Sequence, residues 1–223
     1  MDGFTGTGLA CIRGDRIVFA GLDFAVAPGE ALILSGPNGS GKSSLLRLMA
    51  GIAPPAAGDI AWRGAPVRDD PERFFADMHY VGHRDAVKPA LTVRENLSFH
   101  AALRPGSDPG SDPGGAGIDG ALERVGLAAL AALPARMLSA GQARRLTLAR
   151  ILASPAALWL LDEPTIALDR HSVDRMHAEI AAHRSGGGMV VASTNVPLGI
   201  GDARTIDLAA YAEDRETRWG DSV

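Results

Sequence analysis

The sequence predicts an α/β fold with a mostly parallel core sheet, an antiparallel β subdomain and a helical subdomain. Short apolar runs that have the character of buried strands, such as Ala31–Leu34 and Leu158–Leu161, alternate with helical patterns along the chain. This alternation is typical of a parallel sheet covered by helices. A glycine-rich loop also joins the first of these strands to the helix after it. The chain of 223 residues has the length of one such domain, so we expect a single domain over residues 1–223.

Composition restricts the partners and the surroundings of the chain. Apolar residues make up 46% and charged residues 22%, as in ordinary globular proteins. The net charge of −4 provides no basic footprint, so we expect no nucleic acid partner. Cys11 is the only cysteine, which excludes an intrachain disulfide and favours a reducing compartment. The longest uncharged apolar stretch, Val125–Leu133, is too short to span a bilayer, so any membrane role requires a partner.

Three short antiparallel strands are expected near the N-terminus, because apolar runs alternate there with turn residues. They span Leu9–Ile12, Arg16–Phe19 and Leu22–Val26. Arg13-Gly14-Asp15 and Pro28-Gly29 supply the turn signals. We expect this piece to pack beside the core, and a further strand to form at Gly58–Trp62.

The loop after Ala31–Leu34 has the composition of a phosphate-binding loop. Its residues are Gly36, Pro37, Asn38, Gly39, Ser40, Gly41, Lys42 and Ser43, and Ser44 continues into the helix. The glycines let backbone N–H groups point at an anion, and the helix N-terminus adds about half a positive charge. Lys42 would reach the β- and γ-phosphates and Ser43 would ligate Mg²⁺. A plain glycine-rich turn is the alternative, but the strand and helix flanks favour a site for a nucleoside triphosphate.

The remaining elements continue the alternation, except in one helix-rich region. Met78–Val81 is expected to be a strand leading into Gly82-His83-Arg84. Thr92 and Glu95 form a capping box that predicts a helix over Val93–Leu103. Further helices are expected at 118–125, 141–152 and 170–183, and further strands at 158–161, 188–193 and 205–208. Residues from about 83 to 150 lie outside the strand–helix alternation and predict the helical subdomain.

One low-complexity stretch interrupts that subdomain. Residues 105–115 repeat Gly-Ser-Asp-Pro and contain no side chain that a core would bury. This composition predicts a flexible surface insertion over about residues 104–117, with a functional loop as the alternative.

Two carboxylates follow the apolar strand Leu158–Leu161. Asp162 and Glu163 would lie at the carboxyl end of a core strand, where ligands bind in parallel sheets. Asp162 would hold Mg²⁺, mostly through water, and Glu163 would orient and deprotonate an attacking water. A turn or a cap is the alternative for such a pair, and the phosphate-binding loop earlier in the chain argues against it.

Leu138-Ser139-Ala140-Gly141-Gln142 begins another helix. A helix N-terminus with a hydroxyl and a glycine can bind an anion, although a plain N-cap would fit Ser139 as well. The segment resembles the Leu-Ser-Gly-Gly-Gln motif of ATP-binding cassette (ABC) ATPases, with Ala140 replacing one glycine. Asp162–Thr165 and Ala167–Asp169 resemble that family's Walker B motif and D-loop, and the resemblance extends over about residues 9–208.

This resemblance implies a mechanism and two kinds of partner. In ABC ATPases, two cassettes sandwich two ATP molecules, so Ser139, Gly141 and Gln142 would contact nucleotide held by a second copy of the chain. ATP and Mg²⁺ are the implied cofactors. Hydrolysis would separate the cassettes, and an integral membrane permease docked between core and helical subdomain would follow that motion.

A longer stretch, His79–Leu97, narrows the resemblance. Gly82-His83-Arg84-Asp85 followed by Lys88-Pro89-Ala90-Leu91-Thr92 is similar to the ATP-binding subunits of cytochrome c maturation haem exporters. That family implies haem-handling partners and a peripheral location on the cytoplasmic face of the bacterial inner membrane. An ATPase subunit for another solute is one alternative. A non-transport ABC regulator is less favoured, because the chain has one cassette and its insertion has no heptads.

Three positions depart from the usual ABC pattern. Arg13 stands where the family has an adenine-stacking Tyr, and a guanidinium can also stack on a base. His83 replaces the Gln that ligates Mg²⁺ and senses the γ-phosphate, and Asn195 replaces the switch His after Ser193-Thr194. We expect Glu163, His83 and Asn195 to form the catalytic group, with normal ATP binding and slow hydrolysis.

Overall fold

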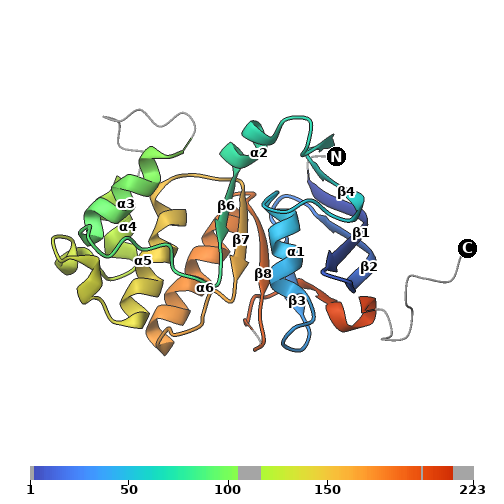
Figure 1. Cartoon of the computed structure of the whole chain (residues 1–223). Coiled ribbons are helices and arrows are strands. Elements are labelled where there is room, and N and C mark those ends of the chain that lie inside the picture. The colour runs from blue at the N-terminus through green and yellow to red at the C-terminus, as the bar shows by residue number, and fades with distance from the viewer. Residues whose placement is uncertain (1–2, 105–116, 197, 213–223) are drawn as a thin grey trace, which may run out of the picture.

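A computed structural model of the chain describes residues 3–104, 117–196 and 198–212. Its elements form layers: an antiparallel sheet, helix α1, a parallel sheet, and a group of helices on the outer face of the parallel sheet (Figure 1). The α/β class and the two kinds of sheet are confirmed. Residues 105–116 of the insertion predicted at about 104–117 lie outside the described residues. Among the residues that are described, no helix is long and apolar enough to cross a bilayer.

The core sheet is parallel throughout, in the order β6-β7-β8-β3-β9. Its strands are β3 (Ala31–Ser35), β6 (Met78–Val81), β7 (Leu158–Asp162), β8 (Met189–Ser193) and β9 (Arg204–Asp207). Every residue of β7 and β8 is buried, which explains their continuous apolar runs. The carboxyl ends of β3, β7 and β8 therefore meet at one edge of the sheet.

The antiparallel sheet has the order β2-β1-β4-β5. Its strands are β1 (Phe4–Arg13), β2 (Arg16–Val26), β4 (Ala57–Trp62) and β5 (Ala65–Pro66). The prediction of separate strands at 16–19 and 22–26 is wrong, because both belong to β2. Leu9 pairs with Leu22 but Cys11 pairs with Phe19, so β2 carries one extra residue at a bulge where Gly21 has φ 66°. The bulge bends the strand without ending it.

Helix α1 (Lys42–Met49) lies between the two sheets and contacts β1, β7 and β8. An aromatic group on the antiparallel side completes this core: Phe4 packs on Phe24, Trp62 and Phe74 at centroid distances of 5.0, 6.1 and 5.8 Å. Phe74 comes from α2 (Pro71–Asp77), which is not among the predicted helices. Its start signals are present in the sequence, since Pro71 is the first helical residue and the Asp70 side chain caps the helix.

The opposite face of the parallel sheet is covered by four helices. They are α3 (Val93–Ala102), α4 (Gly117–Arg124), α5 (Ala140–Ala153) and α6 (Arg170–Ser185). Short 3-10 turns lie at Ala128–Leu130, Ala135–Met137 and Leu208–Tyr211. The predicted Thr92–Glu95 capping box is present at the start of α3. Side chains of α3, α4 and α5 share one buried cluster with Trp159 and Leu161 of β7, so the helix-rich region and the sheet have a common core.

Candidate nucleotide site

The loop between β3 and α1 has a backbone that requires glycine. Gly36 and Gly41 have φ values of 131° and 103°. A Cβ on Gly41 would also lie 2.6 Å from Cγ1 of Val18, so this position has no room for a side chain. The loop consequently runs close against β2 and turns into α1. Within the described ranges no side chain caps this helix N-terminus, and the first turn holds no acidic residue, which leaves the amides available to an anion.

Lys42 turns its ammonium group across the loop. Its side chain is buried, and Nζ donates hydrogen bonds to the carbonyls of Gly36 at 2.6 Å and Pro37 at 3.0 Å. The hydroxyl of Ser40 is buried in the same loop and has no partner among the described residues. A positive charge, free helix amides and an unpartnered hydroxyl in one loop fit a phosphate group.

A cavity of about 390 Å³ opens beside this loop. It is lined by Arg13, Arg16, Val18, Asn38, Gly39, Gly41, Lys42, Ser43, Ser44, Arg47 and Glu163. Arg13, the residue predicted to stack on the base, is among the residues that line this cavity. Arg16 and Arg47 could not be recognised as cavity residues from the sequence, because isolated arginines on a strand and a helix carry no motif. Their charges make the cavity wall strongly basic, as a triphosphate requires.

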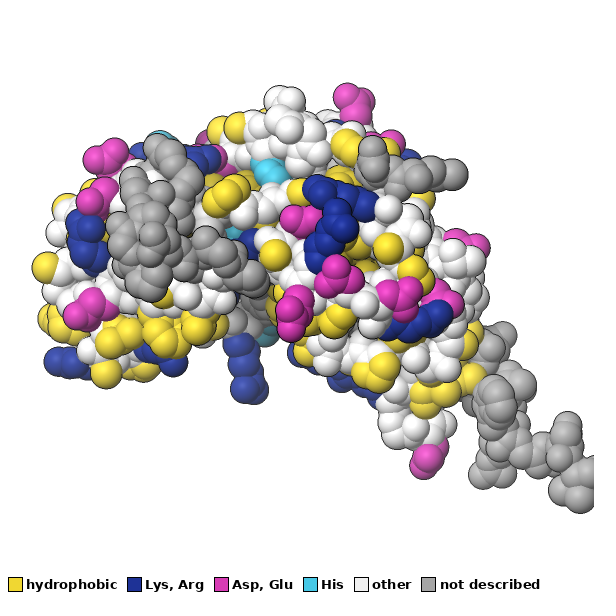
Figure 2. Space-filling view, turned by 90° about the horizontal axis from the view of Figure 1, so that it is seen from above, with side chains coloured by type: hydrophobic (Ala, Val, Ile, Leu, Met, Phe, Trp, Pro, Cys, Tyr) yellow, Lys and Arg dark blue, Asp and Glu magenta, His cyan; other side chains and the backbone are white. Residues whose placement is uncertain are grey.

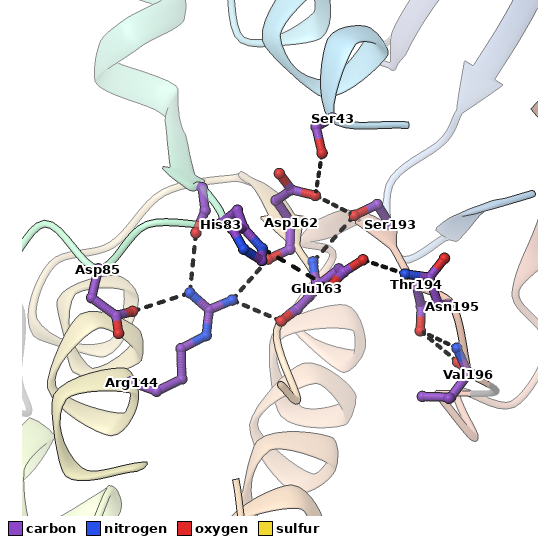
Figure 3. Close-up of polar contacts among 11 residues, drawn as sticks. Ser43, His83, Asp85, Arg144, Asp162, Glu163, Ser193, Thr194, Asn195 and Val196 are labelled. Carbon is purple, nitrogen blue, oxygen red and sulfur yellow. Dashed lines mark hydrogen bonds and ion pairs between the residues drawn. The ribbon is translucent and has the colours of Figure 1, made fainter. Parts of the chain in front are cut away.

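The predicted metal residues Ser43 and Asp162 are in direct contact. Ser43 Oγ donates to Asp162 Oδ1 at 3.1 Å, and Ser193 Oγ donates to the same oxygen at 2.5 Å (Figure 3). Asp162 is only 1% exposed, and its Oδ2 has no partner among the described residues. A buried, unpartnered carboxylate oxygen beside a hydroxyl fits Mg²⁺, which takes few protein ligands and keeps several waters.

Glu163, His83 and Asn195, the three residues predicted to be catalytic, lie close together. Asn195 Nδ2 donates to Glu163 Oε1 at 2.5 Å, and His83 Nδ1 lies 3.9 Å from Glu163 Oε2 (Figure 3). The Glu163 backbone has φ 47°, and its N–H group is held by the carbonyl and the hydroxyl of Ser193. The carboxylate is thereby fixed between an amide and an imidazole at the edge of the cavity.

Ser139, Gly141 and Gln142 lie apart from this cavity, at the start of α5. Ser139 and Gln142 form a reciprocal capping box, so the N-cap reading of Ser139 is correct as far as the local structure goes. A Cβ on Gly141 would lie 2.9 Å from the carbonyl oxygen of Ala167, so a side chain at this position would require the backbone to shift. Ala140 is exposed, so its methyl group is accommodated. None of the three predicted residues is among those that line the cavity.

Arg144 and Ser193 are functional-site residues that sequence reasoning missed. Ser193 bonds both Asp162 and the Glu163 amide, as described above. Arg144 is 1% exposed, and its guanidinium donates to the backbone carbonyls of Asp162 and Glu163. A charged residue on the buried face of a predicted helix was the one available signal for Arg144.

Fold and site together define an ABC-type ATPase cassette. The ABC transporter family model matches residues 19–166. A Paramagnetospirillum magneticum protein named "Cytochrome c biogenesis ATP-binding export protein CcmA" is 52% identical over 213 residues, covering 96% of this chain and 97% of the relative. A Rhodospirillum rubrum protein of the same name is 52% identical over 211 residues, covering 95% and 88%.

A solved structure gives the same assignment at the level of the fold. It comes from Pyrococcus furiosus and is described as an ABC transporter ATP-binding protein. The TM-score is 0.80 at 25% identity, over 95% of this chain and 100% of the other. The chain belongs to the ABC transporter family, and within it to the family of cytochrome c biogenesis ATP-binding export proteins. Both resemblances read from the sequence are confirmed.

Proposed function

We propose that this chain is the ATP-binding and hydrolysing subunit of a cytochrome c biogenesis exporter that handles haem. One observation carries the catalytic part: Ser43, Asp162 and Glu163 converge beside the phosphate-binding loop, where Glu163 lines the cavity and Oδ2 of Asp162 has no partner in the described part of the chain. The names of the relatives support the export system. We place the subunit on the cytoplasmic face of the bacterial inner membrane, held there by its membrane partner.

Each residue has a role that follows from its position. The loop amides and Lys42 bind the β- and γ-phosphates, and the guanidinium of Arg13 stacks on the base. Ser43 and Asp162 hold Mg²⁺, which neutralises phosphate charge when it is bound. Glu163 accepts a proton from water as the water oxygen attacks the γ-phosphorus, and the bond to the bridging oxygen of ADP breaks.

His83 and Asn195 act on the carboxylate that takes this proton. The amide N–H of Asn195 donates to one oxygen of Glu163 and orients it toward the attacking water. The imidazole of His83 faces the other oxygen at 3.9 Å. Both residues therefore act through Glu163, which lines the cavity.

A second copy of the chain completes the site. Ser139, Gly141 and Gln142 bind nucleotide in the family pattern, yet they lie outside the cavity formed by their own chain. Three large apolar side chains are exposed next to the motifs that would face the second copy: Met137, Ile166 and Val196 at 62%, 45% and 60%. Burial of these side chains would favour the ATP-bound dimer.

The membrane permease docks on the loop before α3. Asn96 is buried and holds this loop in shape, since it accepts from the Lys88 amide at 2.7 Å and donates to the carbonyls of Lys88, Leu91 and Thr92. Lys88 lies 4.5 Å over the ring of the exposed Phe99. Figure 2 shows the molecule from above, where hydrophobic side chains are interspersed with Lys, Arg, Asp and Glu side chains on the face that carries α2.

Complementation and nucleotide binding test this function together. In cells that lack the chain, the parent should restore c-type cytochromes, and Lys42→Ala and Glu163→Gln should not. Purified Lys42→Ala should no longer bind ATP, whereas Glu163→Gln should bind it and accumulate as an ATP-bound dimer. The proposal fails if Glu163→Gln hydrolyses ATP at the parent rate, or if loss of the chain leaves c-type cytochromes unchanged.

A further inference from the structure

One buried guanidinium joins three parts of the chain around the active carboxylates. Arg144, on α5, is 1% exposed. Its NH2 group donates to the carbonyls of Asp162 at 2.7 Å and Glu163 at 2.8 Å, at the end of β7 (Figure 3). Its NH1 group donates to the Gly82 carbonyl at 3.0 Å and to Asp85 Oδ1 at 3.2 Å, in the turn after β6. The two terminal nitrogens of the guanidinium therefore link the end of β7 to that turn through hydrogen bonds.

The backbone of Glu163 needs such support. A φ of 47° is unfavourable for a residue with a side chain, and it persists only where the surroundings hold it. Ser193 holds the N–H side of this residue and Arg144 holds its carbonyl side. Because the Glu163 backbone is held at both its N–H and its carbonyl, the direction of the Glu163 carboxylate depends on Arg144, although Arg144 is not among the residues that line the cavity.

We infer that Arg144 is a positioning residue: it sets the orientation of Glu163 and transmits movement of the 82–85 turn to it. This inference rests on the proposed role of Glu163 as the general base. The planar guanidinium suits the task, because its two terminal nitrogens point in different directions and serve two acceptors each. A lysine ammonium in the same place is a single point and cannot bridge the carbonyls of β7 and the Gly82 turn.

The ion pair between Arg144 and Asp85 supports the same positioning role of Arg144. A guanidinium withdrawn from water is costly unless it is paired. Asp85 is the carboxylate that pairs with Arg144, and its side chain is 29% exposed, in the loop that continues into the docking region. A partner that displaces this loop would therefore act on Asp85 first, and through Arg144 on the carbonyl of Glu163.

The test compares two adjacent arginines of α5 in the full-length chain with MgATP. Arg144→Lys should lower kcat by at least about tenfold, because small misplacements of a catalytic group have effects of this size, while KM stays within about twofold. Arg145→Lys is the matched control. Arg145 donates to the carbonyls of Val125 and Gly126, away from β7, so its replacement should change neither constant.

Asp85→Ala removes the carboxylate contact between the 82–85 turn and Arg144, and it leaves the hydrogen bonds from Arg144 to β7 in place. It should lower kcat less than Arg144→Lys does, and the double variant should be no slower than Arg144→Lys alone, because both changes break one path. If Arg144→Lys does not fold, Asp85→Ala decides, and an unchanged kcat then overturns the inference.

Three further outcomes are distinct. Parent-like kcat in Arg144→Lys, with Glu163→Gln inactive, overturns the positioning role and leaves the proposed function intact. A fall in ATP affinity and in the unfolding midpoint at unchanged kcat would show a structural role only. Parent-like hydrolysis by Glu163→Gln would overturn the proposed function itself.

Discussion

At the scale of single residues, Asn195 differs most from the usual ABC site, since it stands where a histidine is expected. Its amide already donates to Glu163 at 2.5 Å, so it orients the base but brings no ionisable ring to the γ-phosphate. A missing preorganised donor costs about 3–4 kcal/mol in the transition state, or on the order of 10²–10³ in rate. The amide recovers only part of this.

We therefore predict that Asn195→His speeds hydrolysis and leaves ATP binding unchanged. Asn195→Ala is the matched control, and it should be slower than the parent because Glu163 loses its donor. Steady-state ATPase rates of the three proteins, each with its membrane partner, measure the effect. A histidine variant no faster than the parent would mean that Thr194 or the partner already supplies the donor.

A second residue-scale prediction concerns His79, which lies in β6 and bonds the Ser154 carbonyl at 2.9 Å. Burial, and next the charge of Arg104, lower the pKa of His79 to about 3 from 6.5. The folded protein thus keeps His79 neutral where the unfolded chain binds a proton. Its contribution to stability is complete above pH 6.5 and is lost progressively as the pH falls toward 3.

Urea unfolding at pH 7.5, 6 and 5 should therefore give a steadily smaller free energy of unfolding. His79→Gln should lessen this pH dependence. Burial also lowers the pKa of His100 and His183, so part of the slope remains in the variant. An identical slope in His79→Gln and the parent would show that His79 is not the group responsible.

At the scale of elements, the loop from His83 to Thr92 connects the partner surface to the site. It begins at the turn held by Arg144 and ends at the capping box of α3, and Asn96 fixes its middle. Arg84 and Lys88 are both exposed on it. Charge reversal there should disturb a protein interface and leave the phosphate-binding loop untouched.

We predict that Arg84→Glu and Lys88→Glu reduce maturation of c-type cytochromes and complex formation with the permease, with near-normal ATP binding. Arg68→Glu, an exposed arginine paired with Asp59 on the antiparallel sheet, is the control. Cytochrome content and co-purification of the permease are the measurements. Normal values after both reversals would place the docking surface elsewhere.

Elements could be predicted where the signal is local. The phosphate-binding loop is fixed by glycine spacing, the Asp162-Glu163 pair by an apolar strand before it, and α3 by its capping box. The runs 16–19 and 22–26 could not be recognised as one strand, because Gly21 at the bulge of β2 resembles a turn residue. The contacts of Arg144 could not be predicted, because its acceptors are mainly backbone carbonyls, which have no sequence signature, from residues 18 to 62 positions away.

At the scale of the whole molecule, the basic cavity and the signature segment lie in different places on one chain. The cavity is built by the end of β1, β2, α1, the loop between β3 and α1, and Glu163 after β7. Ser139 and Gly141 start α5, which packs on α3 and α4. A site that uses both must be shared between two copies, and its activity should depend on their association.

We predict that ATPase activity per chain rises with protein concentration, and that two inactive variants restore it when mixed. Lys42→Ala removes the phosphate counter-charge, and Ser139→Arg places a large cation where the second copy's nucleotide would approach. A mixed dimer has one site in which both changes fall and one in which neither does. The intact site should give up to about half the activity per mixed dimer.

Each variant mixed with itself is the control, and dimer formation is followed by light scattering. If mixed dimers form and stay inactive, while Lys42→Ala and Ser139→Arg chains are folded, the two sites either act only as a pair or are not shared. A covalently linked dimer that carries Lys42→Ala and Ser139→Arg in one chain and no change in the other should then distinguish these cases. If the sites are shared, each contains one change and the dimer is inactive. If they are not shared, the unchanged chain keeps its activity.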